Sequence, residues 1–297
     1  MTFSVPATSA NLGPGFDCLG LSLSLRNFFS ISEADVQSIK ITGEGSENPK
    51  FLQNNLFVGI FKQIYTRLGG QGQFSFDFSN KIPLSRGLGS SSAVISGAIF
   101  SAFKMAGKIP NKQEILDLAL QYEKHPDNIS PAIMGGFTAS FINDTEGAKP
   151  KVIFVRQSIP STIKAVVVVP NYAMATKRAR HKLDASYSLK DCVFNLSRSS
   201  VLSLAFASHK WDLLRESSKD KLHEARRMQA FPVLFGVQKF ALDHGALMSS
   251  LSGSGSSIFN LCYADEASSL QKKLHGRFPR FRVLSLDFDN DGVKLEA

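Results

Sequence analysis

The stretch Pro83-Leu84-Ser85-Arg86-Gly87-Leu88-Gly89-Ser90-Ser91-Ser92-Ala93 determines the fold that we expect for this chain. The preceding segment QFSFDFS, at 73–79, alternates at period two and predicts a strand. The following segment AVISGAIFSAFKMAG, at 93–107, is apolar on nearly all sides and predicts a buried helix. The sequence therefore places a glycine-rich turn between a strand and the N-terminus of a buried helix.

This turn has the composition of a phosphate-binding loop. Gly87 and Gly89 allow the backbone to approach a ligand closely, and the helix N-terminus offers unpaired N–H donors with a partial positive charge. The serines that follow add hydroxyl groups, one of which could ligate Mg²⁺. The loop has no lysine after its second glycine, so it is not a Walker A motif, and it does not match GxGxxG. The alternative is a Gly/Ser turn capped by serine that binds no ligand.

A second glycine-punctuated loop lies near the N-terminus, at Pro6-Ala7-Thr8-Ser9-Ala10-Asn11-Leu12-Gly13-Pro14-Gly15-Phe16-Asp17. A short strand breaks into this loop, and Asn11 and Asp17 supply an amide and a carboxylate to it. A carboxylate here can receive an ammonium group or a hydroxyl. The alternative is an Asx-rich turn with a purely structural role.

The segment Glu123-Lys124-His125-Pro126-Asp127-Asn128 ends an amphipathic stretch at 112–124 that predicts a helix. Glu123 could ligate Mg²⁺, which prefers carboxylate, water and phosphate oxygens. His125, Asp127 and Asn128 crowd a loop that Pro126 stiffens. The alternative for each of them is an ordinary turn at the C-terminus of the helix.

A fourth polar loop, Ser250-Leu251-Ser252-Gly253-Ser254-Gly255-Ser256-Ser257, separates two apolar segments that predict strands, ALMSSL and SSIFNLCY. Such a loop can reinforce a phosphate site or close over a substrate.

The composition bounds the class of protein. The chain has 297 residues, 43% of them hydrophobic and 20% charged, and no uncharged apolar run of about 18 residues, so we expect no membrane span. We expect a cytoplasmic protein, because no signal peptide is evident. We expect neither a disulfide framework nor a zinc site, because the three cysteines are far apart and form no CxxC pair. The formal charge of +9 suits an anionic small substrate. We expect no nucleic-acid partner, since the basic residues are scattered and no aromatic ladder accompanies them.

The other segments alternate between strands and helices without a strict βαβ rhythm, which predicts an α+β fold with two lobes, residues 1–150 and 151–297. Strands are expected within 21–42 and at 135–141, 163–170 and 283–288, and helices at 55–68, 189–209, 233–244 and 265–275.

The four loops occur in a fixed order, PATSANLGPGFD, PLSRGLGSSSA, EKHPDN and LSGSGSS, and this order resembles the GHMP small-molecule kinases. The family is named for its galacto-, homoserine, mevalonate and phosphomevalonate kinases. The resemblance covers essentially the whole chain and is closest to the homoserine branch, on Ser9-Ala10-Asn11-Leu12-Gly13 and on His125-Pro126-Asp127-Asn128. It implies an N-terminal ATP-binding lobe, a C-terminal substrate lobe and phosphorylation of L-homoserine in threonine biosynthesis, with ATP and Mg²⁺ required and a homodimer possible.

The resemblance also implies roles for particular residues. Residues Pro83 and Arg86 to Ala93 match the family's phosphate loop, with Ser91 and Glu123 beside Mg²⁺, and Asn55 matches a residue that contacts the adenine nucleoside. Asn11, Asp17, His125, Asn128 and Gly253 match the substrate site, where Asp17 would hold the homoserine ammonium. In the second lobe Thr176 and Arg180 belong to a run that resembles TKxAR, and Arg180 would bind the substrate carboxylate. Spacing from Asp220 assigns the second carboxylate-binding arginine to Arg227, with Arg226 as the alternative.

The resemblance leaves the proton acceptor open. The mevalonate branch uses an aspartate as general base, whereas the matching position here is Asn128, an amide that cannot accept a proton. Phosphoryl transfer passes through a loose transition state, so positioning and charge neutralisation can supply most of the rate. We therefore expect direct in-line transfer without a dedicated protein base, and Asp127 is the alternative base.

Two other functions stay open from the sequence. One is a kinase of the same family that acts on mevalonate or a sugar-like alcohol, although mevalonate has no ammonium group for Asp17. The other is a non-catalytic ligand sensor, which would have no need of both Ser91 and Glu123.

Overall fold

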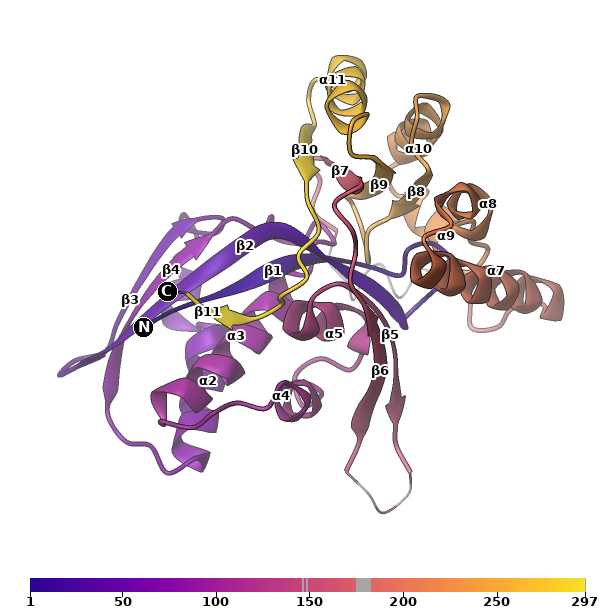
Figure 1. The fold of residues 1–297 in the computed structure, drawn as a ribbon. Helices are drawn as coiled ribbons and strands as arrows, with labels where there is room; N and C mark the ends of the chain where they lie inside the picture. The colour runs from indigo at the N-terminus through magenta and orange to yellow at the C-terminus, as the bar shows by residue number, and fades with distance from the viewer. Residues whose placement is uncertain (146, 148, 175–182, 297) are drawn as a thin grey trace.

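The computed structural model describes residues 1–145, 147, 149–174 and 183–296 (Figure 1). These residues form two β-sheets, each with its own helices, and the α+β fold class with two lobes is confirmed. The first sheet has seven strands in the order β11-β1-β2-β4-β3, with β5 paired to β2 and β6 paired to β5. The second sheet has four strands in the order β10-β7-β9-β8.

The first sheet is built around a long, bent strand. Its strands are β1 (Thr2–Ala10), β2 (Leu19–Ala34), β3 (Ser38–Gly43), β4 (Gln73–Asn80), β5 (Phe137–Asn143), β6 (Lys151–Gln157) and β11 (Lys294–Leu295). β2 pairs with β5 through its first residues and with β4 through its last, and its register against β1 shifts at Pro6/Ala7. β1 is central, and eight of its nine residues are buried, so the polar residues at its end must find partners within the protein.

The expected lobe boundary at residue 150 falls between β5 and β6, which pair with each other along seven residues. The first sheet therefore continues to Gln157. The C-terminal strand β11 also returns to this sheet, where it pairs with β1.

Four helices cover one face of the first sheet (Figure 1): α2 (Leu56–Arg67), α3 (Ser90–Met105), α4 (Lys112–Ala119) and α5 (Pro126–Met134). The period-two pattern of β4 directs Phe74, Phe76 and Phe78 toward α2, where they contact Phe57 and Phe61 in tilted and edge-on pairs. These aromatic contacts fix α2 against the sheet next to the strand that leads into the phosphate loop.

The second sheet carries the rest of the chain. Its strands are β7 (Ile163–Val169), β8 (Met248–Leu251), β9 (Ile258–Tyr263) and β10 (Arg282–Leu286). α10 (Val233–Asp243) and α11 (Ala267–Arg277) pack on it, and α7 (Leu189–Ser208), the 3₁₀ turn Trp211–Leu213, α8 (Leu214–Ser217) and α9 (Glu224–Met228) lie beside it. The short helix α1 (Lys50–Gln53) precedes α2. Among the described residues, no helix is both long and apolar enough to cross a membrane.

Two expectations about local structure are wrong. The helix expected at 112–124 ends at Ala119, and the segment after His125 forms the separate helix α5. Pro126 is favoured at the first position of a helix because its missing N–H would have no partner there. In addition, β6 is a strand that the sequence does not predict; its outer residues are apolar, and it pairs with β5, its neighbour in the chain.

Candidate active site

One cavity of about 340 Å³ brings together residues from all four sequence loops. The expected site residues that line it are Asn11, Asp17, Asn55, Pro83, Arg86, Gly87, Leu88, Gly89, Ser90, Ser91, Ser92, Glu123, His125, Asn128, Arg227 and Gly253. Ala93 is fully buried in the first turn of α3. Thr176 and Arg180 lie outside the described residues.

The phosphate loop requires both of its glycines. Gly87 and Gly89 have φ values of +75° and +68°, which L-residues with side chains rarely adopt. A Cβ atom on Gly89 would lie 1.9 Å from Thr8 Oγ1, and one on Gly87 would lie 2.0 Å from the Ser252 carbonyl oxygen. Gly89 is also the N-cap of α3 and has no side-chain acceptor, in contrast to the serine-capped alternative. The first N–H groups of α3 therefore stay available to a ligand in the cavity.

Hydrogen bonds connect the phosphate loop to both lobes. The backbone N–H of Thr8 donates to the Leu88 carbonyl (3.2 Å), and the Ser252 hydroxyl donates to the Gly87 carbonyl (2.7 Å). The Arg86 guanidinium donates to the carbonyls of Pro170 (2.8 Å) and Leu84 (3.0 Å). The fourth loop therefore packs against the phosphate loop, and Arg86 helps to hold the phosphate loop against the end of β7.

One end of the cavity is apolar. Its walls include Phe29, Ile41, Phe57 and Phe78, residues that the sequence reading assigned only to strands and a helix. Asn55 opens α2 at this end, where its Oδ1 accepts from the Val58 N–H (3.2 Å) and its Nδ2 donates to the Phe51 carbonyl (3.0 Å). The phenylalanines at every second position of β4 predict an apolar face of this strand. Their spacing does not show that this face also lines a cavity.

The other end of the cavity is polar and held by the fourth loop. Asn11 Oδ1 accepts from the Asp17 backbone N–H (3.0 Å), and Asn11 Nδ2 donates to the Gly253 carbonyl (3.0 Å). Arg227 Nη1 donates to the same carbonyl (3.1 Å). Asn11 and Asp17 have φ values of +69° and +60°, conformations that cost about 1–3 kcal/mol each and persist where surrounding bonds enforce them. Asp17 and Arg227 thus meet in one cavity across the two lobes.

His125 lies between two of the carboxylates that line the cavity, those of Asp17 and Glu123. It is the N-cap of α5, and its Nδ1 lies 3.2 Å from Glu123 Oε1, while its Nε2 lies 3.9 Å from Asp17 Oδ2. The alternative of an isolated C-terminal turn is wrong for this segment, because it starts a helix and faces the cavity.

Asn128 is oriented by Thr8, a residue that the sequence reading did not assign to the site. The buried Thr8 hydroxyl donates to Asn128 Oδ1 (2.7 Å), which directs Asn128 Nδ2 toward the carboxylate of Asp127 (3.5 Å). Asp127 lies in the first turn of α5, where the helix dipole stabilises negative charge. The side-chain amide of Asn128 is therefore presented as a hydrogen-bond donor next to an anionic group.

A buried polar cluster around His223 holds Arg227 by a hydrogen bond. His223 Nε2 donates to the Gly13 carbonyl (2.7 Å), its Nδ1 accepts from Arg227 Nη1 (3.2 Å), and its ring stacks on Phe16. Burial lowers the pKa of His223 to about 4, so this ring is neutral near pH 7. Burial, together with the nearby Asp220 carboxylate, raises the pKa of Glu224 to about 8.

The two candidate arginines differ in their surroundings. Arg227 is 2% exposed and lines the cavity, whereas Arg226 faces outward, where it pairs with Asp184 and donates to the Lys221 carbonyl. The geometry favours Arg227 for contact with a ligand.

The donor set of the cavity fits Mg²⁺ in the presence of a nucleotide. Among the described residues, no three His, Cys, Asp or Glu side chains are grouped so that they could hold a metal alone. Mg²⁺ is commonly held by one or two carboxylates together with substrate phosphates and water. The Glu123 carboxylate and the exposed Ser91 hydroxyl are among the cavity groups with this chemistry.

Comparisons with known proteins identify the family of this chain. The sequence models of the GHMP kinases N terminal domain and the GHMP kinases C terminal domain match residues 55–136 and 203–280. The chain is 56% identical to the homoserine kinase of Wolinella succinogenes, with 99% of each chain covered, and 53% identical to that of Helicobacter pylori, with 100% of this chain and 99% of the relative covered. The crystal structure of homoserine kinase from Cytophaga hutchinsonii matches with a TM-score of 0.86 at 26% identity, covering 99% of this chain and 96% of the other. A mevalonate kinase structure shares the fold, with a TM-score of 0.74 at 15% identity over 98% of this chain and all of the other.

Proposed function

The chain belongs to the homoserine kinases of the GHMP kinase family, and on this basis we propose that it transfers the γ-phosphate of ATP to the side-chain hydroxyl of L-homoserine. The products are O-phospho-L-homoserine and ADP, and the reaction serves threonine biosynthesis. The observation that carries this proposal is the single cavity in which the glycine turn at the N-terminus of α3 meets Asp17 and Arg227.

The apolar end of the cavity is the site that we assign to adenine, beside Asn55. The polyphosphate then extends over Gly87 to Ser92, where the N–H groups of α3 and the helix dipole stabilise its negative charge. Glu123 and Ser91 would hold Mg²⁺, which neutralises phosphate charge when it is bound.

The amino-acid substrate binds at the polar end. Asp17 receives the ammonium group, because it is the carboxylate that Asn11 holds in the cavity wall. Arg227 binds the substrate carboxylate with its planar guanidinium, and we assign Arg180 the same role from the family pattern. A substrate with both charges satisfies both residues, whereas mevalonate would leave Asp17 without a cationic partner.

Transfer proceeds in line, with no dedicated protein base. The Asn128 amide donates to the reacting oxygens and His125 orients Asp17, so the residues near the hydroxyl position it and do not take its proton. The proton passes to the transferred phosphoryl group. Asp127, in the first turn of α5, is the other candidate for a base.

The test is an ADP-release assay with ATP and Mg²⁺ on L-homoserine, L-serine, L-threonine and mevalonate. We expect kcat/KM to be highest for homoserine, because the relatives that share more than half of this sequence are homoserine kinases. Activity on mevalonate alone would support the other family activity. Binding of homoserine without turnover, in the presence of ATP, would support a ligand sensor.

We also propose that the reaction takes place in the cytoplasm. Cys18, Cys192 and Cys262 are all free thiols, which agrees with a reducing compartment.

A further inference from the structure

A second concave site lies in the first lobe, and we call it the basic groove after Lys104, Lys112, Arg156 and Lys294, which line it. It is bounded by the C-terminal half of α3, the start of α4, the strand β6 and the C-terminal segment that leads to β11 (Figure 1). The groove has a volume of about 740 Å³, within the range of about 300–1,000 Å³ that is usual for small-molecule sites. Among the described residues, none lines both the basic groove and the active-site cavity.

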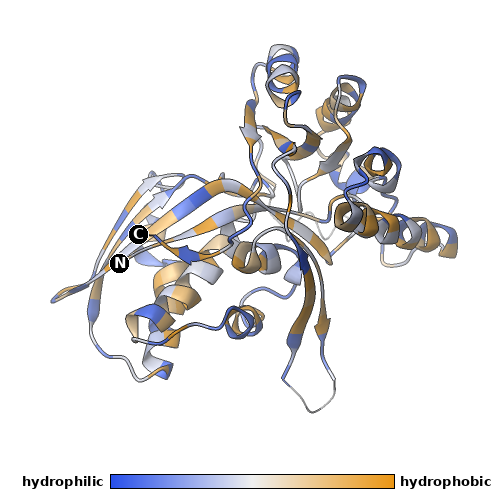
Figure 2. Cartoon of the chain, in the orientation of Figure 1, coloured by the Kyte–Doolittle hydropathy of each residue, from blue (hydrophilic) through white to orange (hydrophobic). Residues whose placement is uncertain are grey.

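The floor of the basic groove is apolar. Phe100, Met134 and Val293 are buried beneath it, and the exposed side chain of Ile109 lies at its rim. Figure 2 shows hydrophobic residues on α5 next to hydrophilic residues on the C-terminal segment before β11. A floor of this kind can take the apolar part of a ligand out of water.

The walls of the basic groove are positively charged. The four cations that line it are half-buried and come from four different elements, α3, α4, β6 and β11. Among the described residues that line the groove, Asp291 is the only carboxylate, and it pairs with Lys294 (3.1 Å). Four cations and one carboxylate leave the groove with a net charge of +3.

Lys112 shows that this positive charge is not compensated within the groove. The two carboxylates near it, Asp289 and Asp291, each pair with another cation. Burial and the Arg156 guanidinium lower the pKa of Lys112 below its usual value, although both carboxylates act in the opposite direction. A bound anion would therefore offset an existing cost of charge at this position.

Neutral groups hold two of the cations in place. Arg156 Nε donates to the carbonyls of Met134 (3.0 Å) and Gly135 (3.1 Å), and its two Nη atoms donate to a serine hydroxyl and to another carbonyl. Lys112 Nζ donates to the Asp291 carbonyl (2.5 Å). A guanidinium has five N–H donors and an ammonium has three, so each of these side chains keeps two donors for a ligand.

We propose that the basic groove binds a small organic anion. Its phosphate or carboxylate group lies against Lys104, Lys112 and Arg156, and its apolar part lies on the floor of the groove. The guanidinium fork and the ammonium groups suit either anionic group. The site is preorganised, because the carbonyl oxygens that hold Arg156 and Lys112 fix them before a ligand arrives.

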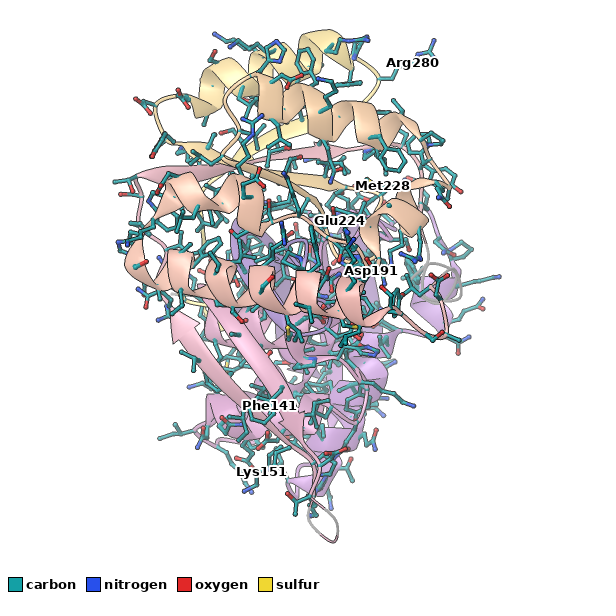
Figure 3. All side chains as sticks on the ribbon, turned by 90° about the vertical axis from the view of Figure 1, so that its right-hand side faces the viewer. Phe141, Lys151, Asp191, Glu224, Met228 and Arg280 are labelled. Atoms are coloured by element: carbon teal, nitrogen blue, oxygen red, sulfur yellow. The ribbon has the colours of Figure 1, made fainter. Side chains whose placement is uncertain are left out.

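The basic groove is too distant from the active-site cavity for one ligand to occupy both. Ser90 opens α3 at the cavity, and Lys104 lies in the last turn of the same helix, roughly 21 Å further along it at 1.5 Å per residue. Figure 3 shows a similar separation from the second lobe, with Lys151, where β6 begins, far below Glu224 and Met228 of α9. An anion in the groove and a nucleotide in the cavity can therefore bind together.

The first test is isothermal titration calorimetry of the full chain with phenyl phosphate, with and without saturating ADP and Mg²⁺. We expect binding that ADP does not displace, and we expect inorganic phosphate to bind about 10-fold more weakly or less, because it has no apolar part to bury. Benzoate is the carboxylate counterpart of phenyl phosphate, and the tighter of the two identifies the preferred anionic group. Benzylamine, a cation of similar size, should not bind.

The matched variants are Lys104→Gln and Lys108→Gln. Lys104→Gln should weaken phenyl phosphate binding about 10-fold or more, because it removes a charged hydrogen bond. Lys108→Gln removes the same charge from an exposed position that does not line the groove, so it should bind as wild type does. This comparison holds whether or not ADP binds to the cavity.

The second test uses the wild-type chain, so it does not depend on how a variant folds. Pyridoxal 5′-phosphate carries an aromatic ring, a phosphate and an aldehyde that condenses with a neutral lysine amine to an imine and water, and borohydride then reduces the imine. Peptide mapping by mass spectrometry should find Lys112 labelled in preference to the exposed Lys108. Excess phenyl phosphate should protect Lys112 and should not protect Lys108.

The proposal is overturned if phenyl phosphate does not bind at about 10 mM, or if ADP displaces it, which would place the anion in the active-site cavity. It is equally overturned if Lys104→Gln and Lys108→Gln bind phenyl phosphate alike, or if phenyl phosphate fails to protect Lys112 from labelling.

Discussion

Glu224 should make the stability of this enzyme fall as the pH rises above neutrality. The Glu224 residue is 7% exposed, and its carboxyl group accepts from the Leu251 backbone N–H (2.5 Å) and from Gln238 (3.2 Å). Burial and the Asp220 carboxylate raise its pKa from 4.5 to about 8. The folded protein therefore holds a proton that the unfolded chain has already released between about pH 4.5 and pH 8. Stability is lost as the pH rises through this interval.

His223 acts in the opposite direction at lower pH, which fixes the window for the test. Its folded pKa of about 4 lies below its usual value of 6.5, so its contribution is present above pH 6.5 and is lost as the pH falls toward 4. Of these two groups, only Glu224 changes the stability between pH 6.5 and pH 8. A difference of one proton over 1.5 pH units is worth about 2 kcal/mol.

The measurement is urea unfolding of the wild type and of Glu224→Gln at pH 6.5 and at pH 8.0. The wild type should lose about 2 kcal/mol between the two values, and the variant should lose much less, because glutamine keeps an acceptor for Leu251 and carries no proton to release. The matched control is Glu216→Gln, since Glu216 is exposed and its pKa is lowered by its hydrogen bond to Lys219. Equal losses in wild type and Glu224→Gln would refute the assignment of this slope to Glu224.

Three further predictions concern the cavity. Arg227→Lys should raise the homoserine KM at least about 10-fold, because losing one charged hydrogen bond costs about 1.5–3 kcal/mol, and should leave the ATP KM within about twofold. Arg226→Lys should change neither KM. A raised homoserine KM in Arg226→Lys, with none in Arg227→Lys, would assign the substrate carboxylate to Arg226. Gly89→Ala should raise the ATP KM steeply, because its Cβ would clash with Thr8. The control Gly59→Ala, which lies in open space on α2, should leave the ATP KM unchanged and should stabilise the protein by about 0.5–1 kcal/mol in thermal unfolding. Asp127→Asn should keep a substantial rate of phosphoryl transfer in single-turnover assays. Loss of transfer with intact homoserine binding would identify Asp127 as the base.

The sequence predicted the elements whose periodicity is strong. The helices α2, α3, α7 and α10 lie within a few residues of their expected ranges, as does β7, because an apolar face or a β-branched run is set by local spacing. The break between α4 and α5 was missed because an amphipathic pattern continues through a turn, and only Pro126 marked the new start. The strand β6 was missed because its pairing with β5 depends on a hairpin whose polar turn resembled a lobe boundary.

The candidate site could be predicted as a list of loops but not as a set of contacts. The glycine turn, Asp17 and Glu123 are recognisable from residue type, because their chemistry needs those residues. Thr8 and His223 are not, because a buried threonine in a strand and a histidine before a short helix have no distinctive pattern. Their roles come from contacts between residues 120 and 210 positions apart in the chain, Thr8 with Asn128 and His223 with Gly13, and only the fold creates them.

The inner side of α7 is joined to the substrate site by buried hydrogen bonds. On its inner side the buried Asn195 donates to Asp220 Oδ1 (2.7 Å), and Asp220 Oδ2 accepts from the N–H groups of His223 and Glu224, which open the helix that carries Arg227. The position of Arg227 therefore depends on where α7 sits. Asn195→Ala, which removes the hydrogen bond to Asp220, should therefore raise the homoserine KM more than the ATP KM in steady-state assays. Equal changes in both KM values would refute this link, since Asn195 itself does not line the cavity.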